Sequence, residues 1–383
     1  MSAPSPSLLD AQLGIGYEGK GEDWSFAKSS ERKDRPLTNE QLKVLTAKSN
    51  AAGLRQLSLQ YTEMAFAAAL IAYSSVVAGV LSAALRTAGT LLLGFGIVTM
   101  GHCAQHECIH NTAFASRRLN VVVSWLVSIP RFTNPRWERM LHKDHHTYTN
   151  DPKRDPEIMA GNPANSMPGD MKSYITKLLR IGGGKFGLGV WSARFAILIS
   201  GARGHIVGYS GFDPVPAPKA AAVRDSLAAS CQAQLAFYAG LAAVLTVVPG
   251  GWAAAAKFWI LPLLVGEPLH AFFHIADHLN TEQDYKNGRT NTRTTLAPRF
   301  VSFNLWNMNY HAEHHLYPSI PFHQLPAAHA ALAGHFERVS PSAFDMHKQL
   351  LTRWMPHFRE RLQSTGNAGV EGQGWTPCTP DRA

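Results

Sequence analysis

The stretch that decides the fold covers residues 306–325 and reads WNMNYHAEHHLYPSIPFHQL. It contains an H-x-x-H-H pattern made by His311, His314 and His315. In a helix, residues three and four apart share a face, so His311 would lie close to both of the others. Converging imidazoles are costly to bury unless something binds them, and a metal ion is the usual occupant. The stretch therefore predicts a metal site.

Earlier parts of the chain repeat this pattern, which makes a chance cluster of histidines a poor explanation. We call residues 106–110 (HECIH) box one, residues 142–146 (HKDHH) box two and residues 311–315 (HAEHH) box three. Boxes two and three have identical spacing, and box one offers two imidazoles four residues apart. Further histidines at four-residue spacing stand next to the boxes or at the end of an apolar run: His102, His270, His274 and His278.

Charged side chains are scarce, at 16% of the sequence against about 25% in typical soluble domains. The shortage is concentrated in four apolar runs, at residues 65–85, 87–105, 226–248 and 252–273. Each run reaches roughly the 20 residues that a helix needs to cross a bilayer core. A soluble helical bundle is the alternative interpretation. The pattern favours an all-α integral membrane protein, with four transmembrane helices arranged as two hairpins.

The net charge of +9 could suggest a nucleic-acid partner, but its distribution indicates a membrane topology instead. Lysine and arginine crowd residues 1–60, residues 117–224 and the chain after Lys286. Positive loops stay on the cytoplasmic side, so we expect both termini and the long central loop there. The second and fourth spans then both run inward, and all three boxes share the cytoplasmic side. No nucleic-acid partner is expected.

Three regions follow from this organisation: a cytoplasmic N-terminal segment (1–60), a four-span catalytic domain (61–340) and a polar, partly disordered tail (341–383). Residues 14–19 fit G-x-G-x-x-G, but no strand pattern precedes them, so we interpret them as a flexible loop and expect no dinucleotide. Thr38 is a predicted helix N-cap with Gln41 at the third helical position.

With the surrounding residues, the three boxes resemble the membrane fatty acid desaturase and hydroxylase superfamily over about residues 60–335. The similarity extends to TNDP after box two, NTRTT before box three, and the runs NYHAEHHLYP and PFH. The chain departs from the family at residues 277–278, where Asp-His stands in place of the usual Glu-His pair. The side chain of Asp277 is one methylene shorter than that of the usual glutamate.

The resemblance implies a non-haem centre of two Fe²⁺ ions held by nine histidines. Imidazole alone would also suit zinc, copper or nickel, so iron comes from the resemblance and not from the spacing. The implied ligands are His106, His110, His142, His145, His146, His278, His311, His314 and His315. Candidates to orient or line the site are His102, His274, Glu107, Asp144, Asp277 and Glu313. For Glu107, Asp144 and Glu313, exposed solubilising charges are the alternative.

The function that the resemblance implies is O2-dependent oxidation of an unactivated C–H bond in a lipid or fatty acyl substrate, foremost fatty acyl desaturation. A hydroxylase or ketolase would use the same scaffold and stays open. The sequence has no His-Pro-Gly-Gly haem motif, flavin motif or cysteine cluster, so an external ferredoxin or cytochrome b5-type donor is implied. Box one also fits the H-E-x-x-H motif of zinc proteases, and a non-catalytic membrane metal-binding protein is the remaining alternative.

Overall fold

Helices form nearly all the regular structure in the parts of the chain that the computed structural model describes. These parts are residues 36–151, 154–159, 167–181, 189–208, 221–275, 277–357 and 359–360. They divide into two units. Unit 1 takes its described residues from 49–140 and 191–266, and unit 2 takes them from 36–48, 141–190 and 267–360. The G-x-G-x-x-G motif and the end of the polar tail lie outside the described residues.

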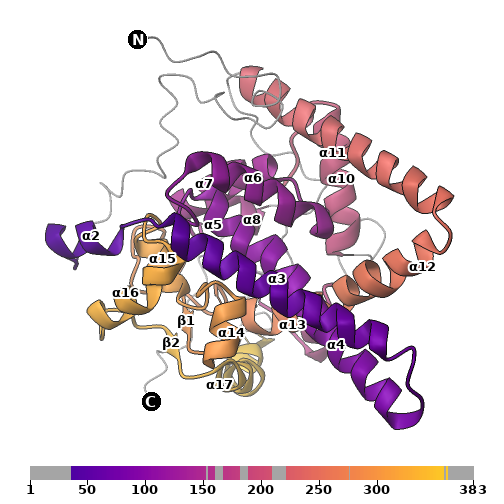
Figure 1. Cartoon of the computed structure of the whole chain (residues 1–383). Helices are drawn as coiled ribbons and strands as arrows, with labels where there is room; N and C mark the ends of the chain where they lie inside the picture. The colour runs from indigo at the N-terminus through magenta and orange to yellow at the C-terminus, as the bar shows by residue number, and fades with distance from the viewer. Residues whose placement is uncertain are drawn as a thin grey trace. The chain divides into compact units, whose positions relative to one another are not determined.

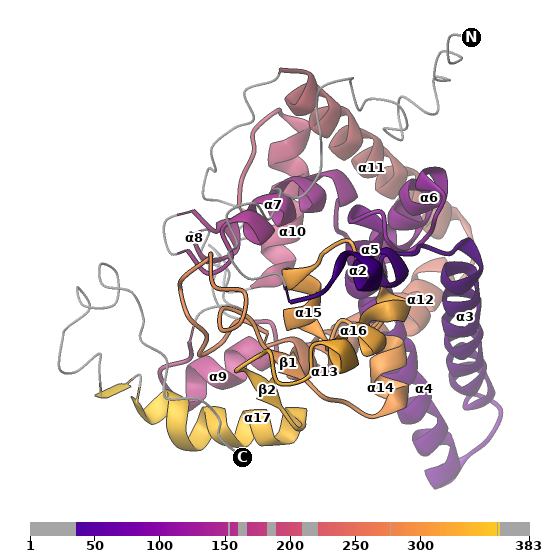
Figure 2. The ribbon, with the colours of Figure 1, turned by 90° about the vertical axis from the view of Figure 1, so that its left-hand side faces the viewer.

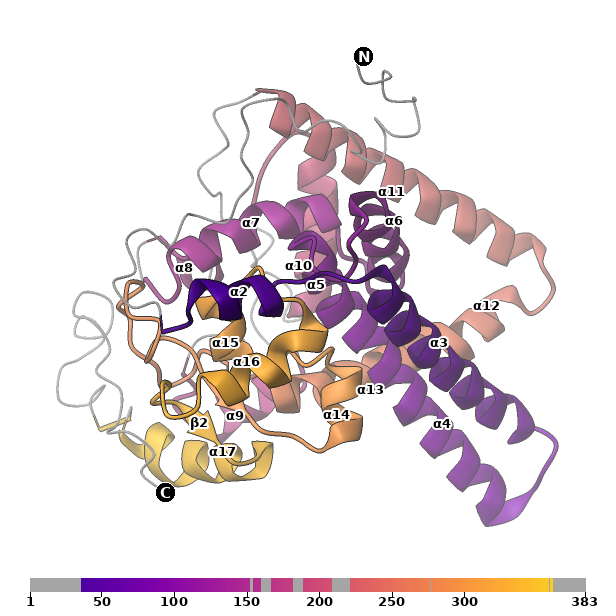
Figure 3. The same cartoon turned by 60° about the vertical axis from the view of Figure 1, so that its left-hand side comes forward.

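Unit 1 contains a long helical hairpin, formed by α3 (Asn50–Tyr73) and α4 (Gly79–Thr99), which lie side by side (Figures 1 and 3). Buried Ala67 and Ile71 of α3 pack with Leu93 and Ile97 of α4 in an apolar cluster. The second helix continues through a π-helix, η2 (Met100–Ala104), into α5 (Gln105–Ile109). Box one therefore stands at the end of one continuous helical stretch.

The turn of this hairpin lies elsewhere than the sequence predicted. We expected spans at residues 65–85 and 87–105, with the break near Arg86, and this boundary is wrong because Arg86 lies inside α4. The chain turns between Tyr73 and Gly79, where Gly79 has a φ of +66° that side chains rarely allow. The Ser82 hydroxyl donates to the Ser74 carbonyl at 2.6 Å. A sequence that is apolar throughout does not indicate where such a turn lies.

In unit 1, the segment that leads into box two is hydrogen-bonded to a later helix. Asn134 donates through Nδ2 to Gln234 Oε1 at 3.0 Å, and the Tyr238 hydroxyl donates to the Ile129 carbonyl at 2.8 Å. These bonds fix the chain just before α7 (Pro135–Thr147) against α11 (Ala221–Val247). The elements are α6 (Arg117–Ser128), η3 (Ile129–Arg131), the start of α7 (Pro135–Thr147), α10 (Val190–Ala202), α11 (Ala221–Val247), α12 (Gly251–Ala255), η4 (Ala256–Ile260) and the start of α13 (Leu261–His274).

Two helical stretches among the described residues are long and apolar enough to cross a membrane, Gly79–Ile109 and Val223–Val247. A shorter apolar helix covers Val190–Ala202. Large apolar side chains of unit 1 are exposed, for example Val80 at 87% and Val247 at 78%. Such exposure is costly in water and suits contact with lipid. The structure thus supports two of the expected membrane helices by length and composition.

Unit 2 is built from short helices joined by ordered loops. Its first helix, α2 (Asn39–Leu45), has the predicted capping box: Gln41 N donates to Thr38 Oγ1 at 3.2 Å, and Thr38 N donates to Gln41 Oε1 at 2.8 Å. The other elements are the end of α7, α8 (Pro156–Met159), α9 (Met171–Leu178), the end of α13, β1 (Thr294–Thr295), α14 (Arg299–Asn304), α15 (His311–Leu316), η5 (Phe322–Gln324), α16 (Leu325–Ala331), β2 (Val339–Ser340), α17 (Ala343–Gln349) and η6 (Leu350–Trp354).

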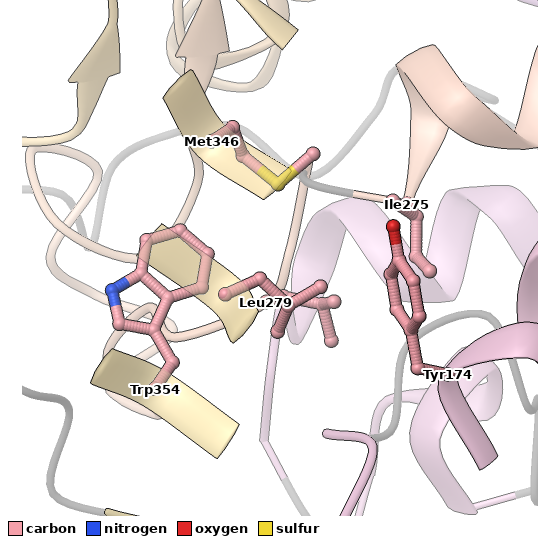
Figure 4. Close-up of a cluster of buried hydrophobic side chains, with 6 residues drawn as sticks. Tyr174, Ile275, Leu279, Met346 and Trp354 are labelled. Carbon is pink, nitrogen blue, oxygen red and sulfur yellow. The ribbon is translucent and has the colours of Figure 1, made fainter. Parts of the chain in front are cut away.

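The core of unit 2 joins segments that are far apart in the sequence. Helices α9 and α17 lie near one another (Figure 2), and Leu279 lies between Trp354 and Tyr174 in the buried cluster that they form with Met346 (Figure 4). Strands β1 and β2 pair in parallel over two residues. The expected all-α class therefore holds for most of the described chain, with this one short pair of strands added.

Candidate metal centre

Box one lies in unit 1, at the end of α5. Its spacing of four residues brings His106 Nε2 to 3.0 Å from His110 Nε2, and both side chains are buried. Glu107, between them, is fully buried. His102, one turn earlier in η2, accepts from Arg131 Nη1 through Nδ1 at 3.3 Å. The sequence therefore correctly places two imidazoles together, while His102 is held by an arginine.

Box two lies on the last turns of α7 and belongs to unit 2. His142 and His146, four residues apart, place their Nε2 atoms 2.8 Å from one another. His145 faces a different side and directs Nδ1 to the Asp155 carboxylate, at 2.9 Å from Oδ2. All three histidines are buried. A single helix turn thus presents imidazoles to two separate places.

Box three lies on α15, where all three histidines are buried. His314 Nε2 is 3.2 Å from His146 Nε2, which joins box three to box two. His311 Nε2 is 2.9 Å from Nε2 of His278, the histidine that follows the end of α13. His315 stacks on His146, with ring centroids 4.1 Å apart. Residues separated by more than 160 positions in the sequence therefore meet here.

Seven of the nine expected ligands form two neighbouring groups in unit 2. In each group the ring nitrogens lie within 4.8 Å of one another. The first group contains His142, His146 and His314, and the second contains His145, His278, His311 and His315. The other two expected ligands, His106 and His110, form the pair in unit 1.

The distances between nitrogens fit metal ligands better than a set of hydrogen bonds. Two nitrogens bound at about 2.1 Å and at right angles on one ion lie roughly 3.0 Å apart. The Nε2–Nε2 distances in unit 2 are 2.8, 2.9 and 3.2 Å. His146 Nε2 faces both His142 and His314, although one ring nitrogen has only one proton or one lone pair to share. One ion would satisfy all three nitrogens.

In His315 and His145, a neighbouring side chain holds the ring nitrogen Nδ1, and this orients Nε2. His315 Nδ1 lies 3.2 Å from Thr149 Oγ1, and that hydroxyl donates to the His145 carbonyl at 2.9 Å. The hydroxyl proton is therefore used, so His315 donates through Nδ1 and keeps a lone pair on Nε2. Asp155 does the same for His145. Metal-binding histidines commonly donate their other N–H in this way.

Two carboxylates that sequence reasoning missed lie next to box two, Asp155 and Glu157. Asp155 is fully buried and accepts from His145 Nδ1 and from the backbone N–H of Asn150, the latter at 2.7 Å. Glu157 Oε1 lies 3.5 Å from His142 Nδ1 and 3.9 Å from His145 Nε2. Their position nine and eleven residues after the end of the box gave no periodic signal.

The carboxylates that the sequence did single out have different positions. Asp277 accepts from His274 Nδ1 at 2.8 Å, and its Oδ2 is 3.9 Å from His311 Nδ1. Glu313 is fully buried and binds Thr294 and His329, each at 2.5 Å, so it holds α15 against β1 and α16. Asp144 is exposed, as the alternative of a solubilising charge predicted.

Buried imidazoles in unit 2 favour the neutral form, which is the form that binds metals. Burial lowers the pKa of His278, His311, His314 and His315 well below the usual value of 6.5. His145 is the exception: burial opposes its charged form, but Asp155 and Glu157 together raise its pKa to about 9. His145 and His142 in turn hold the pKa of Glu157 well below its usual range, although burial acts in the opposite direction.

Comparison with known proteins gives one positive finding. A family model described as fatty acid desaturase matches residues 81–344. The matched region includes boxes one, two and three, together with His278. None of the curated proteins compared with the chain matches it.

Proposed function

The chain belongs to the fatty acid desaturase family, and from this premise we propose that it oxidises an unactivated C–H bond of a fatty acyl chain with O2 and leaves a double bond. The family implies an oxidoreductase that acts on lipids, which argues against a zinc protease and a non-catalytic metal-binding protein. The observation that carries the proposal is the pair of buried histidine groups in unit 2, made by residues of boxes two and three with His278.

The proposed cofactor is a pair of Fe²⁺ ions bound by the nine histidines of the three boxes and His278. Iron is proposed because of the family, and the burial and spacing of the seven imidazoles in unit 2 support a bound metal. His106 and His110 would complete the set. When bound, iron supplies the activation of O2 and the abstraction of hydrogen that this oxidation requires.

The protein's own part in the reaction is to orient ligands and exclude water. Thr149 and Asp155 hold the Nδ1 protons of His315 and His145, so that each ring presents Nε2. Burial of the boxes keeps bulk water from the site, where it would cause side reactions during the oxidation of an unactivated C–H bond. His102 and His274 are proposed to line the site, because neither belongs to the two histidine groups of unit 2, and the hydrogen bond from Arg131 to His102 Nδ1 leaves the ring proton of His102 on Nε2.

The proposed location is a membrane, with four spans in two hairpins and both termini and the boxes on the cytoplasmic side. Two long apolar helices and the exposed apolar side chains of unit 1 support the membrane. The lysine and arginine distribution supports the sidedness. Electrons are proposed to come from an external ferredoxin or cytochrome b5-type protein, because the sequence has no motif for a redox group of its own.

Mass spectrometry of lipids tests the reaction directly. Cells that express the chain are compared with cells that express His315→Ala, which removes a buried imidazole of the second histidine group. A product lighter by two hydrogens, present only with the unaltered chain, supports desaturation. A product heavier by one oxygen would replace desaturation with the hydroxylase alternative. If the purified chain lacks iron and forms no product, the proposal is wrong.

A further inference from the structure

Glu157 is placed among the imidazoles of box two, although its position in the sequence gives no hint of this. It lies in the short helix α8 and is 9% exposed. Together with His142 and His145 it forms a third group of potential ligand atoms, which all lie within 4.8 Å of one another. His142 belongs to the first histidine group and His145 to the second. Glu157 therefore stands where the two groups meet.

The distances allow Glu157 to share an ion with His145. Two atoms bound to one ion at about 2.1 Å cannot lie farther apart than roughly 4.2 Å. Glu157 Oε1 is 3.9 Å from His145 Nε2, the nitrogen that His145 presents once Asp155 holds its Nδ1. The same oxygen is 3.5 Å from Nδ1 of His142, whose Nε2 faces His146. One carboxylate thus reaches a ligand of each histidine group.

Asp155 fixes Glu157 in this place. The backbone N–H of Glu157 donates to Asp155 Oδ1 at 2.9 Å, while Asp155 Oδ2 accepts from Asn150 N and lies 2.9 Å from His145 Nδ1. Asn150 is itself tied down, since its Nδ2 donates to the Thr281 hydroxyl at 2.6 Å. The backbone of Glu157 is consequently held by the same residue that orients His145.

Charge balance gives an independent reason for a carboxylate here. Divalent ions bound only by neutral imidazoles would leave a large positive charge in a buried place, where unbalanced charge is costly. Glu157 lies close enough to His278, in the second histidine group, to act on it electrostatically. An anionic oxygen among these nitrogens lowers the net charge where it is highest.

We propose that Glu157 is a further metal ligand, which binds the ion held by His145, His278, His311 and His315 through one carboxylate oxygen and accepts the Nδ1 proton of His142. The Glu157 carboxylate thereby connects the ion of the second histidine group to His142, which is a ligand of the ion in the first group. This inference rests on the proposed function, because it takes for granted that both histidine groups hold iron.

The test is the iron content of the full chain purified in detergent, with Glu157→Gln as the variant. Glutamine keeps an oxygen that accepts from His142 but removes the anionic ligand. The unaltered chain should hold about two irons and Glu157→Gln about one, with one of two ferrous signals lost from the ⁵⁷Fe Mössbauer spectrum. Glu337→Gln, at an exposed carboxylate of unit 2, is the matched control and should keep both irons.

Unchanged iron content and an unchanged spectrum in Glu157→Gln would overturn the inference, and so would the loss of both irons from a folded variant. If Glu157→Gln does not fold, Glu157→Asp decides: one altered ferrous signal beside one unaltered signal supports the inference, and two unaltered signals overturn it. An unaltered chain without iron would refute the proposed function itself, whereas two irons and the same spectrum in both proteins refute only the role of Glu157.

Discussion

At the scale of single residues, opposing pKa shifts should give the metal-free protein its greatest stability near pH 6.5. Burial lowers the pKa of His311, His314 and His315, so the unfolded chain binds more protons below about 6.5 and stability falls as pH falls. Asp155 and Glu157 raise the pKa of His145 to about 9, so its contribution is lost as pH rises from 6.5 through 9. Thermal unfolding of the metal-free protein across this range checks the maximum.

The variant Asp155→Asn distinguishes the loss of stability below pH 6.5 from the loss of stability between pH 6.5 and 9. The variant removes one of the two carboxylate charges that raise the pKa of His145, so the alkaline loss of stability should shrink while the acid loss remains. Asp284→Asn, at an exposed carboxylate of unit 2, should leave both sides unchanged. A metal-free protein whose stability rises steadily from pH 6.5 to 9 would contradict the assigned role of Asp155.

At the scale of elements, close packing between α4 and α13 in unit 1 depends on glycine. A Cβ at Gly94 would lie 2.1 Å from the Pro262 carbonyl oxygen, which belongs to backbone and cannot swing away. Gly94→Ala should therefore lower the free energy of unfolding by about 1–3 kcal/mol, as overpacking typically does. The measurement is thermal or denaturant unfolding in detergent.

Gly240→Ala on α11 is the matched control. Nothing lies within 4 Å of a Cβ there, so the variant should be neutral or gain up to about 1 kcal/mol from the better helix propensity of alanine. Equal effects of the two substitutions would mean that α4 and α13 do not pack through Gly94.

Local patterns in the sequence predicted the local features of these elements and little else. The capping box of Thr38 and Gln41 and the convergence of His106 with His110 depend on spacing within one helix. The placement of Glu157 depends on a hydrogen bond to Asp155 and on tertiary contacts, so no periodic pattern in the sequence predicts it. The turn before Gly79 was misplaced, because an apolar run reports hydrophobicity and not where the chain reverses.

At the scale of the whole molecule, the proposed topology predicts which turns face outward. Val76, between α3 and α4, and Val248, after α11, should lie on the far side of the membrane, and Ala115, after box one, on the cytoplasmic side. Single cysteines at these exposed positions are treated in intact cells with a thiol reagent that does not cross membranes. We expect labelling of Val76→Cys and Val248→Cys, and of Ala115→Cys only after permeabilisation.

The native cysteines should not react with the reagent, since Cys103, Cys108 and Cys231 are buried. Cys378 is replaced by serine in the background chain. Positive loops resist translocation, and Arg117 and Arg118 lie two and three residues after Ala115, so this loop has a physical reason to stay inside. Outward labelling at Ala115 would invert the hairpins and place box one away from a cytoplasmic electron donor. Labelling of Val76 without Val248 would leave one hairpin in the membrane and require the second apolar stretch to pack against protein instead of lipid.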